Sequence, residues 1–135
     1  MIVNDPEIVA EVTAAADAYE AALMANDLKA LDRFFWSSPH TVRYGVAENL
    51  YGFNQIAAFR VGRTGGSPLR ARLRVEVTTF GRDFAIVNTE FLRHNAERPG
   101  RQSQTWVRTA LGWKVASAHV SLLAGGADQR ITDAK

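Results

Sequence analysis

The chain has 135 residues, of which 47% are hydrophobic and 22% are charged. These values are typical of one globular domain and exclude a disordered or coiled-coil protein. It contains no cysteine, which excludes disulfide bonds, thiol nucleophiles and thiolate metal sites. The net charge is only +2, yet all but three of the 16 basic residues are arginine, which binds planar carboxylates through two parallel hydrogen bonds. We therefore expect an anionic small molecule as the ligand, and not a nucleic acid.

The amino-terminal stretch and the distribution of apolar residues indicate where the protein is located. The amino-terminal stretch MIVNDPEIV lacks the basic and apolar segments of a signal peptide, and no run of about 18 apolar residues occurs. We therefore expect a cytoplasmic protein without a membrane span. We expect one domain over residues 1–123, followed by a disordered tail over residues 124–135.

Two helices are expected at the start of the chain. Asp5 can cap the first helix and Pro6 suits its first position, and the helical pattern continues to about Asn26. Asp27 caps a short second helix, which must end before Pro39. The apolar stripe of the first helix consists of Ile8, Val12, Ala15, Ala16, Tyr19 and Leu23.

A third helix and a sheet follow. The helical period returns over residues 53–63, and most of the remaining chain alternates with period two. We expect strands at residues 41–46, 73–78, 84–93, 102–108 and 113–122. The order predicts an α+β protein in which three helices cover one face of a curved antiparallel sheet of about four to five strands.

This layout, with NDLKALDRFFW near the start and GWKVASAHVS at the end, resembles the nuclear-transport-factor-two-like (NTF2-like, or SnoaL-like) superfamily over about residues 5–123. The stretches RYGVAENLYG, IAAFR, TFGRDFA, NTEF and GRQSQTWVR are similar, more narrowly, to the AtzH-like proteins. The resemblance implies a cone-shaped α+β fold whose sheet and helices enclose one pocket. Because one fold hosts many functions, the chemistry must be argued from the residues of the site.

The AtzH-like resemblance also implies an activity. These proteins stand beside amidase-signature enzymes in nitrogen catabolism, which suggests such an enzyme as a partner. The implied reaction is the decarboxylating hydrolysis of 1,3-dicarboxyurea to allophanate in cyanuric acid and s-triazine breakdown, without cofactor. Related proteins also accompany purine and oxalurate degradation, so another ureido acid is an alternative substrate.

Arg43 is the most unusual residue of the predicted strands. It lies in the alternating stretch HTVRYGVAENLYG, where an apolar residue or threonine would suit a strand better. A buried arginine needs an anionic partner, either a protein carboxylate, for which Glu48 and Glu90 are candidates, or a ligand. The resemblance implies the second reading, in which Arg43 anchors a substrate carboxylate.

Tyr19 is the expected partner of Arg43 in catalysis. By periodicity alone it is a core tyrosine on the stripe of the first helix. The AtzH-like resemblance implies a functional tyrosine on this helix, opposite the strand arginine. Arg43 would hold one carboxylate while Tyr19 donates a proton or hydrogen bond to the urea nitrogen or oxygen. Direct decarboxylation and hydrolysis by a positioned water both fit these roles.

Four further residues are expected to bind substrate. Strand alternation places His119 and Ser117 on one face, which we assign to the pocket together with Arg43. Arg60 lies at the buried edge of the third helix, and either it or Arg63 is expected as a second anion contact, with a solvated helix face as the alternative. Trp106 is either pocket wall or packing, and His119 either contacts substrate or completes a core hydrogen-bond network.

Other functions fit the sequence less well. The chain has no HExxH, GxSxG or phosphate-loop motif, and its three histidines lie far apart, so a metal site is not expected. A non-catalytic binding or amidase-accessory module also needs Arg43 but not Tyr19. An isomerase or cyclase would need an inward carboxylate base, for which Glu90 is the only candidate. Arg72, Arg74 and Glu76 alternate along one strand face, which predicts back-to-back pairing of two sheets in a homodimer or larger homo-oligomer.

Overall fold

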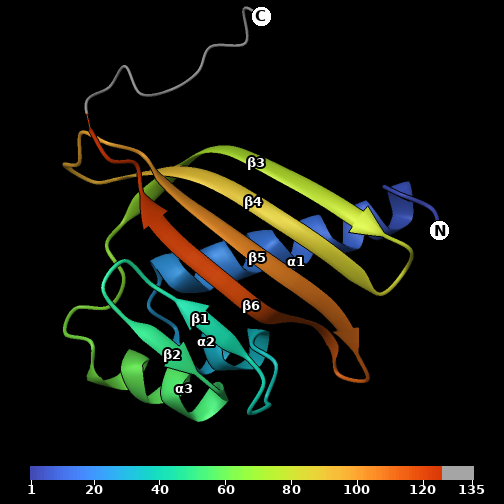
Figure 1. Ribbon diagram of the computed structural model, residues 1–135, viewed down its shortest axis with the longest axis horizontal. Coiled ribbons are helices and arrows are strands. Elements are labelled where there is room, and N and C mark those ends of the chain that lie inside the picture. The colour runs from blue at the N-terminus through green and yellow to red at the C-terminus, as the bar shows by residue number, and fades with distance from the viewer. Residues whose placement is uncertain (126–135) are drawn as a thin grey trace, which may run out of the picture.

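The computed structural model describes residues 1–125 of the chain (Figure 1). The predicted tail lies almost wholly outside these residues. Within residues 1–125, no helix is long and apolar enough to span a membrane. The elements are α1 (Pro6–Met24), α2 (Leu28–Phe34), β1 (Val42–Tyr44), β2 (Asn49–Tyr51), α3 (Phe53–Gly62), β3 (Arg70–Phe80), β4 (Phe84–Arg93), β5 (Gly100–Thr109) and β6 (Gly112–Leu122).

The helix starts follow the predicted capping residues. The Asp5 side chain accepts a hydrogen bond from the backbone N–H of Glu7, and the Asp27 side chain accepts one from Ala30. Both bonds satisfy amide groups that the first helical turn leaves unpaired. The chain leaves α1 through Asn26, whose φ of 52° is the left-handed conformation that ends helices. The buried residues of α1 are Ile8, Val12, Ala16, Tyr19, Ala22 and Leu23.

The sheet has six strands in the order β2-β1-β6-β5-β4-β3. Strands β3 to β6 form an antiparallel meander, whereas β1 runs parallel to β6. The expectation of four to five antiparallel strands is therefore wrong in count and in one pairing. The chain reaches β1 from α2 through Trp36, whose N–H donates to the Val115 carbonyl, so it enters alongside β6 in the same direction. The three-residue strand β2 is too short to show alternation.

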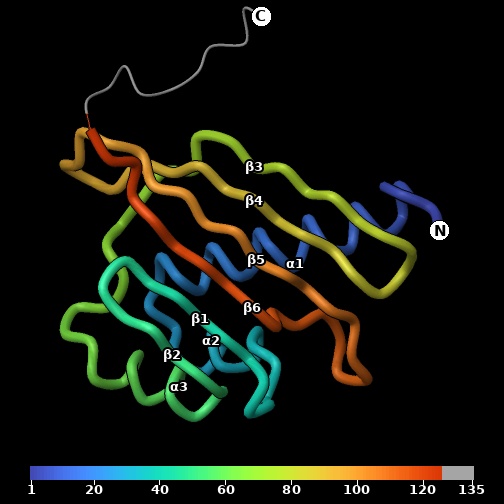
Figure 2. Tube along the Cα trace, viewed as in Figure 1, coloured from blue at the N-terminus to red at the C-terminus, as the bar shows by residue number. Residues whose placement is uncertain are grey.

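One face of the sheet is covered and the other is open. Figures 1 and 2 show α1 crossing one face of strands β3 to β6, while α2, α3, β1 and β2 gather beside β6. The core lies between α1 and this face, with Trp106, Val87 and Val115 at most 1% exposed. The opposite face has no covering element within the described residues.

Two β-bulges change which residues share a face. Leu73 is the extra residue where the β3–β4 register shifts, and Ala116 is the extra residue of β6 where Thr105 pairs with Ser117 but Trp106 pairs with Val115. Arg72 consequently faces the helices and pairs with Asp17 of α1 at 3.0 Å. The prediction that Arg72, Arg74 and Glu76 share one face is therefore wrong for Arg72, because a bulge reverses the alternation.

Candidate functional site

Arg43 of β1 is paired with Glu48 of the β1–β2 turn. The distance from Arg43 Nη1 to Glu48 Oε2 is 2.9 Å, and the side chains are 15% and 23% exposed. The guanidinium carbon of Arg43 also lies 5.6 Å from the centre of the Phe59 ring, on α3. Of the two predicted protein partners, Glu48 is confirmed. Glu90 is not, because it lies on the open face of the sheet between the buried residues Thr89 and Phe91.

Helix α3 and the residue that caps its end contribute two more arginines beside Arg43. Arg60 is buried, with a side chain 5% exposed, and its Nη1 atom lies 2.7 Å from Asp32 Oδ1. Its guanidinium carbon stacks 4.4 Å from the centre of the Phe35 ring. Arg63 is half-buried, and its guanidinium carbon lies 5.4 Å from the centre of the Phe59 ring, which Arg43 also contacts. We call Arg43, Arg60 and Arg63 the arginine cluster.

The arginine cluster has unused hydrogen-bond donors. The Nη2 atom of Arg60 and the Nε atom of Arg63 are buried and have no hydrogen-bond partner among the described residues. Buried guanidinium groups normally have every N–H paired, because an unpaired one forfeits its hydration without compensation. Two such donors, one in the last turn of α3 and one on the residue that caps it, are the feature expected of a site that binds an anion.

The lowered pKa values of Arg60 and Arg63 also favour an anion-binding site. Burial lowers the pKa of Arg60, and burial together with the charges of Arg43 and Arg60 lowers the pKa of Arg63. A lowered arginine pKa means that the folded protein holds the positive charge at a free-energy cost. A bound anion would reduce this cost.

Tyr19 faces the arginine cluster from α1. Its side chain lies close enough to both Arg60 and Arg63 to affect their pKa values, and it is only 4% exposed. Its ring packs on Phe34 and Phe35 with centroid distances of 6.1 Å. Within residues 1–125 its hydroxyl makes no hydrogen bond. The structure thus brings Tyr19, Arg43 and Arg60 together from three separate elements.

Ser117 and His119 do not join this group. Arg43 aligns with the buried Ala118, whereas Tyr44 aligns with His119, so Arg43 and His119 occupy opposite faces of the sheet. Ser117 and His119 are both exposed on the open face, and the His119 ring packs edge-on against Tyr44. Their predicted place in the pocket is wrong because the bulge at Ala116 reverses the alternation of β6.

Trp106 is on the same face as the cluster but is completely buried. Its ring centroid is 6.4 Å from that of Tyr19, and its Nε1 atom donates to Gln104 Oε1 at 3.1 Å. With its polar atom already paired and no exposed surface, Trp106 packs against Tyr19 as a core residue.

Sequence reasoning missed Asp32 and Gly45. Asp32 neutralises Arg60 from 28 residues away in the chain, a distance at which local spacing gives no signal. Gly45 makes room for Glu48, since a Cβ atom there would lie 1.8 Å from Glu48 Oε2. The signal for Gly45 was present in the sequence: it is the small residue two positions beyond Arg43 on the same face of the strand.

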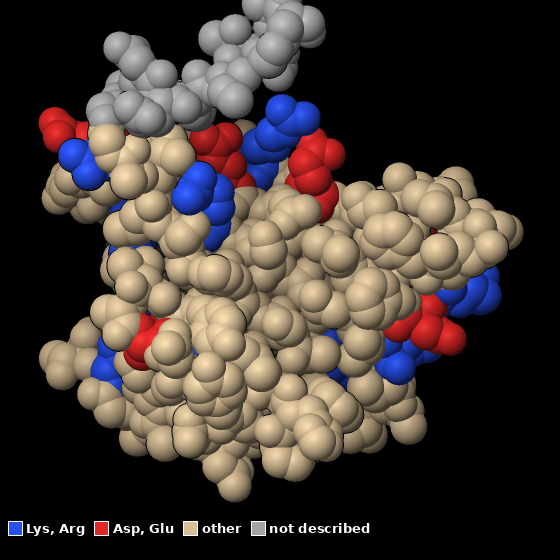
Figure 3. All heavy atoms as spheres, in the orientation of Figure 1, with Lys and Arg blue, Asp and Glu red and all other residues tan. Residues whose placement is uncertain are grey.

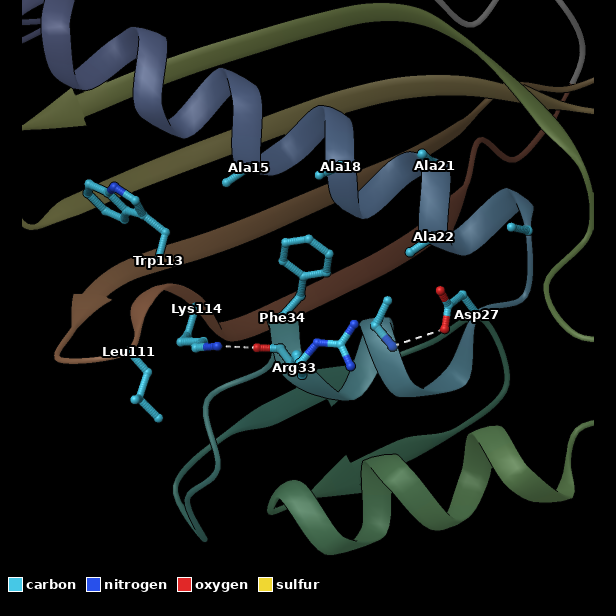
Figure 4. Close-up of a pocket in the computed structure, with 12 residues that line it drawn as sticks. Ala15, Ala18, Ala21, Ala22, Asp27, Arg33, Phe34, Leu111, Trp113 and Lys114 are labelled. Atoms are coloured by element: carbon cyan, nitrogen blue, oxygen red, sulfur yellow. Dashed lines mark hydrogen bonds between the residues drawn. The ribbon is translucent and has the colours of Figure 1, made fainter.

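A separate groove of about 690 Å³ lies between α1, α2 and the start of β6 (Figure 4). Figure 4 shows Ala15, Ala18 and Ala22 along one wall, with Trp113 and Phe34 opposite. Lys114 closes part of it by donating a hydrogen bond to the Arg33 carbonyl. Neither Tyr19 nor the arginine cluster lines this groove. Among residues 1–125, no three potential metal ligands converge.

Known structures define the fold class. An NTF2-like superfamily protein from Salmonella enterica serovar Typhimurium is 22% identical, with a TM-score of 0.73 over 93% of this chain and 99% of that one. The three helices and the curved, unclosed mixed sheet are those of the NTF2-like fold, as the sequence predicted. At this identity the similarity shows the fold alone.

More similar structures come from two other bacteria. A cystatin-like fold protein from Burkholderia xenovorans is 50% identical, with a TM-score of 0.87 over 93% of this chain and 98% of that one. A protein of unknown function of the DUF3225 family from Pectobacterium atrosepticum is 47% identical, with a TM-score of 0.88 over 90% and 95% of the two chains. No curated protein matches the sequence. Residues 1–126 match the AtzH-like family profile, and the chain belongs to the AtzH-like family.

Replacing Arg63 with methionine should stabilise the protein. The change removes a charge held at a cost and an unpaired buried Nε, while keeping apolar contact with Phe59. We expect the free energy of unfolding to rise by about 0.5–2 kcal/mol in urea titrations. Arg72→Met, which breaks an ion pair with the exposed Asp17, is the control and should change it by less than about 0.5 kcal/mol. A loss of stability in Arg63→Met would show that this arginine has an unrecognised partner.

Proposed function

We propose that this protein is a metal-independent enzyme of nitrogen catabolism. Its reaction is the decarboxylating amidohydrolysis of 1,3-dicarboxyurea, or of a related N-carboxylated urea, to allophanate. The observation that supports this proposal is the pair of unpaired, buried N–H donors on Arg60 and Arg63, which lie beside Arg43 and face Tyr19. A compact cationic site of this kind suits a small dianion, and a carboxylated urea is the substrate class that the AtzH-like resemblance implies.

The roles follow from the chemistry of an N-carboxylate. Arg43 holds one carboxylate, and Arg60 holds the other or the urea oxygen. When the carbon–nitrogen bond to a carboxylate breaks, the carboxylate leaves as carbon dioxide and its bonding electron pair stays on nitrogen. Tyr19 supplies the proton to that nitrogen, and Arg60 and Arg63 stabilise the tyrosinate until solvent reprotonates it. In the hydrolytic variant a water attacks the carboxylate carbon and bicarbonate leaves.

The test is conversion of freshly generated dicarboxyurea to allophanate, followed against the spontaneous reaction. The proposal requires the wild-type protein to accelerate this conversion. If the rate equals the background over a range of protein concentrations, dicarboxyurea is not the substrate, and other ureido acids should be screened.

The alternative is a non-catalytic protein that binds a carboxylated intermediate or docks on an amidase-signature enzyme. The packing of Tyr19 between Phe34, Phe35 and Trp106 favours this reading, because it is also the environment of a structural tyrosine. An isomerase or cyclase is not proposed, because Glu90 lies on the open face of the sheet. We propose a cytoplasmic location for the protein, whether it is the enzyme or the non-catalytic binding protein.

We further propose that the open sheet face pairs two copies of the chain. Figure 3 shows this face as largely uncharged at its centre, with acidic and basic groups toward the rims. The centre carries Ile86, which aligns with Thr78 and Thr105 of the neighbouring strands. We expect light scattering after size exclusion to give at least twice the 14.9 kDa chain mass.

Two variants test whether this face forms the contact. Ile86→Lys should convert the oligomer to a monomer, because it places a charge at the centre of the apolar contact. The control Leu111→Lys adds the same charge at an 85% exposed turn residue and should leave the mass unchanged. A wild-type mass of one chain would contradict the pairing.

A further inference from the structure

The Glu48 carboxylate fills the space that a side chain at Gly45 would otherwise occupy. A Cβ atom on Gly45 would lie 1.8, 2.4 and 2.9 Å from Oε2, Cδ and Oε1 of Glu48, so the carboxylate fills the space of the missing side chain. The Gly45 N–H also donates to the Glu48 carbonyl at 2.8 Å, which fixes the turn that carries this side chain. Gly45 has no positive φ, so the backbone does not require glycine here. What the position requires is the absence of a side chain.

The charges at the site do not balance in this state. Three guanidinium groups, those of the arginine cluster, meet two carboxylates, those of Glu48 and Asp32, and Arg93 of β4 adds a further positive charge near Arg43 and Glu48. At least one positive charge is therefore in excess, and the unpaired donors of Arg60 and Arg63 are where a ligand would contact it. If Glu48 left, at least two positive charges would be in excess, which suits a dicarboxylate.

Glu48 is able to leave. It belongs to the turn between β1 and β2, and its side chain is 23% exposed. Among residues 1–125, its other oxygen accepts a hydrogen bond only from the Ala47 N–H, at 3.3 Å. Asp32, in contrast, pairs with a 5% exposed arginine at 2.7 Å. The Arg43–Glu48 pair is largely buried, at 15% and 23% exposure, and the desolvation of such a pair offsets most of its attraction, so a ligand carboxylate that takes the place of Glu48 and also satisfies Arg60 and Arg63 can replace it.

We infer that Glu48 occupies the position of one ligand carboxylate, and that a dicarboxylate displaces it from Arg43 while a monocarboxylate leaves it in place. Glu48 and Gly45 thereby set the selectivity of the site for dianions. This inference rests on the proposed role of Arg43 as the carboxylate anchor, but it concerns binding and not turnover.

The experiment is calorimetric titration with two unreactive probes. Glutarate carries two carboxylates separated by three atoms, as dicarboxyurea does, and glutaramate replaces one of them with a neutral amide of the same shape. Glu48→Gln removes the competing charge. Gly45→Ala keeps that charge but excludes the carboxylate from its place beside Arg43. Glu76→Gln, which removes a carboxylate paired with Arg74 on the open face, is the control.

We expect both Glu48→Gln and Gly45→Ala to bind glutarate about five- to tenfold more tightly than wild type. Their affinity for glutaramate should change by less than about twofold, and Glu76→Gln should match wild type for both probes. Thermal unfolding by circular dichroism checks that each variant is folded. The inference is overturned if a folded variant of either kind fails to bind glutarate more tightly, or if no form of the protein binds it.

This outcome is independent of the proposed reaction. If the affinities shift as expected while dicarboxyurea is not converted, the displacement of Glu48 stands and the enzyme proposal fails. If dicarboxyurea is converted while glutarate affinity does not respond to the variants, the enzyme proposal stands and the role of Glu48 fails.

Discussion

Tyr19→Phe should lower the rate of dicarboxyurea conversion by about two to four orders of magnitude while leaving glutarate affinity close to that of the wild type. The expected size is that of a lost general acid. The variant removes only a hydroxyl that makes no hydrogen bond within residues 1–125, and it keeps the ring that packs on Phe34, Phe35 and Trp106. The fold should therefore be unaffected, and the loss should appear in kcat and not in binding.

Arg43→Ala should behave differently from Tyr19→Phe. It removes the anchor and leaves Glu48 without its partner, so both turnover and glutarate affinity should fall, turnover to the spontaneous rate. Single-turnover kinetics and titration of the same samples separate the two effects. Tyr51→Phe, at a tyrosine 53% exposed on β2, is the matched control and should retain wild-type activity.

A Tyr19→Phe variant with wild-type turnover would remove Tyr19 from the mechanism. If, in addition, the wild-type protein bound glutarate without accelerating dicarboxyurea conversion, the binding-protein alternative would be supported. The tyrosine hydroxyl thus decides between the two functions, because only an enzyme needs its proton.

Trp106→Ala should lower the free energy of unfolding by about 3–5 kcal/mol. The side chain is completely buried, packs on Tyr19 and Phe34 at centroid distances of 6.4 and 6.1 Å, and donates a hydrogen bond to Gln104. Its removal would leave a large cavity beside Tyr19 and an unpaired oxygen on Gln104. Urea unfolding followed by circular dichroism measures the loss.

Trp106→Phe is the graded control, because it keeps an aromatic ring and removes the indole N–H. Its expected loss is smaller, about 1–2 kcal/mol, since less volume is removed but the Gln104 oxygen is still left unpaired. A loss below about 1 kcal/mol in Trp106→Ala would contradict the packing role and favour the predicted role of Trp106 as a wall of the ligand site.

Local sequence signals located the elements well. Asp5 and Asp27 cap the two helices where predicted, and the long strands β4, β5 and β6 fall where the alternation indicated. These features depend on residues a few positions apart, which the sequence displays directly. The strand β2 was missed because three residues are too few to show a period.

The orientation of strand residues was predicted less well. One inserted residue at Leu73 and another at Ala116 reversed the alternation of β3 and β6, and this moved Arg72 to the covered face and Ser117 and His119 to the open one. A bulge is a feature of pairing between two strands, so neither strand's sequence alone reveals it.

By itself the sequence determined the α+β class, the family resemblance, and the presence of an arginine and a tyrosine that need explaining. Only the tertiary structure decided that Arg43 pairs with Glu48 over Gly45, that Asp32 neutralises Arg60, and that two guanidinium donors stay unpaired. The physical reason is that burial and charge balance depend on groups brought together from α1, α2, α3 and β1. Whether a buried arginine is satisfied is a property of its surroundings in space, and no local pattern encodes it.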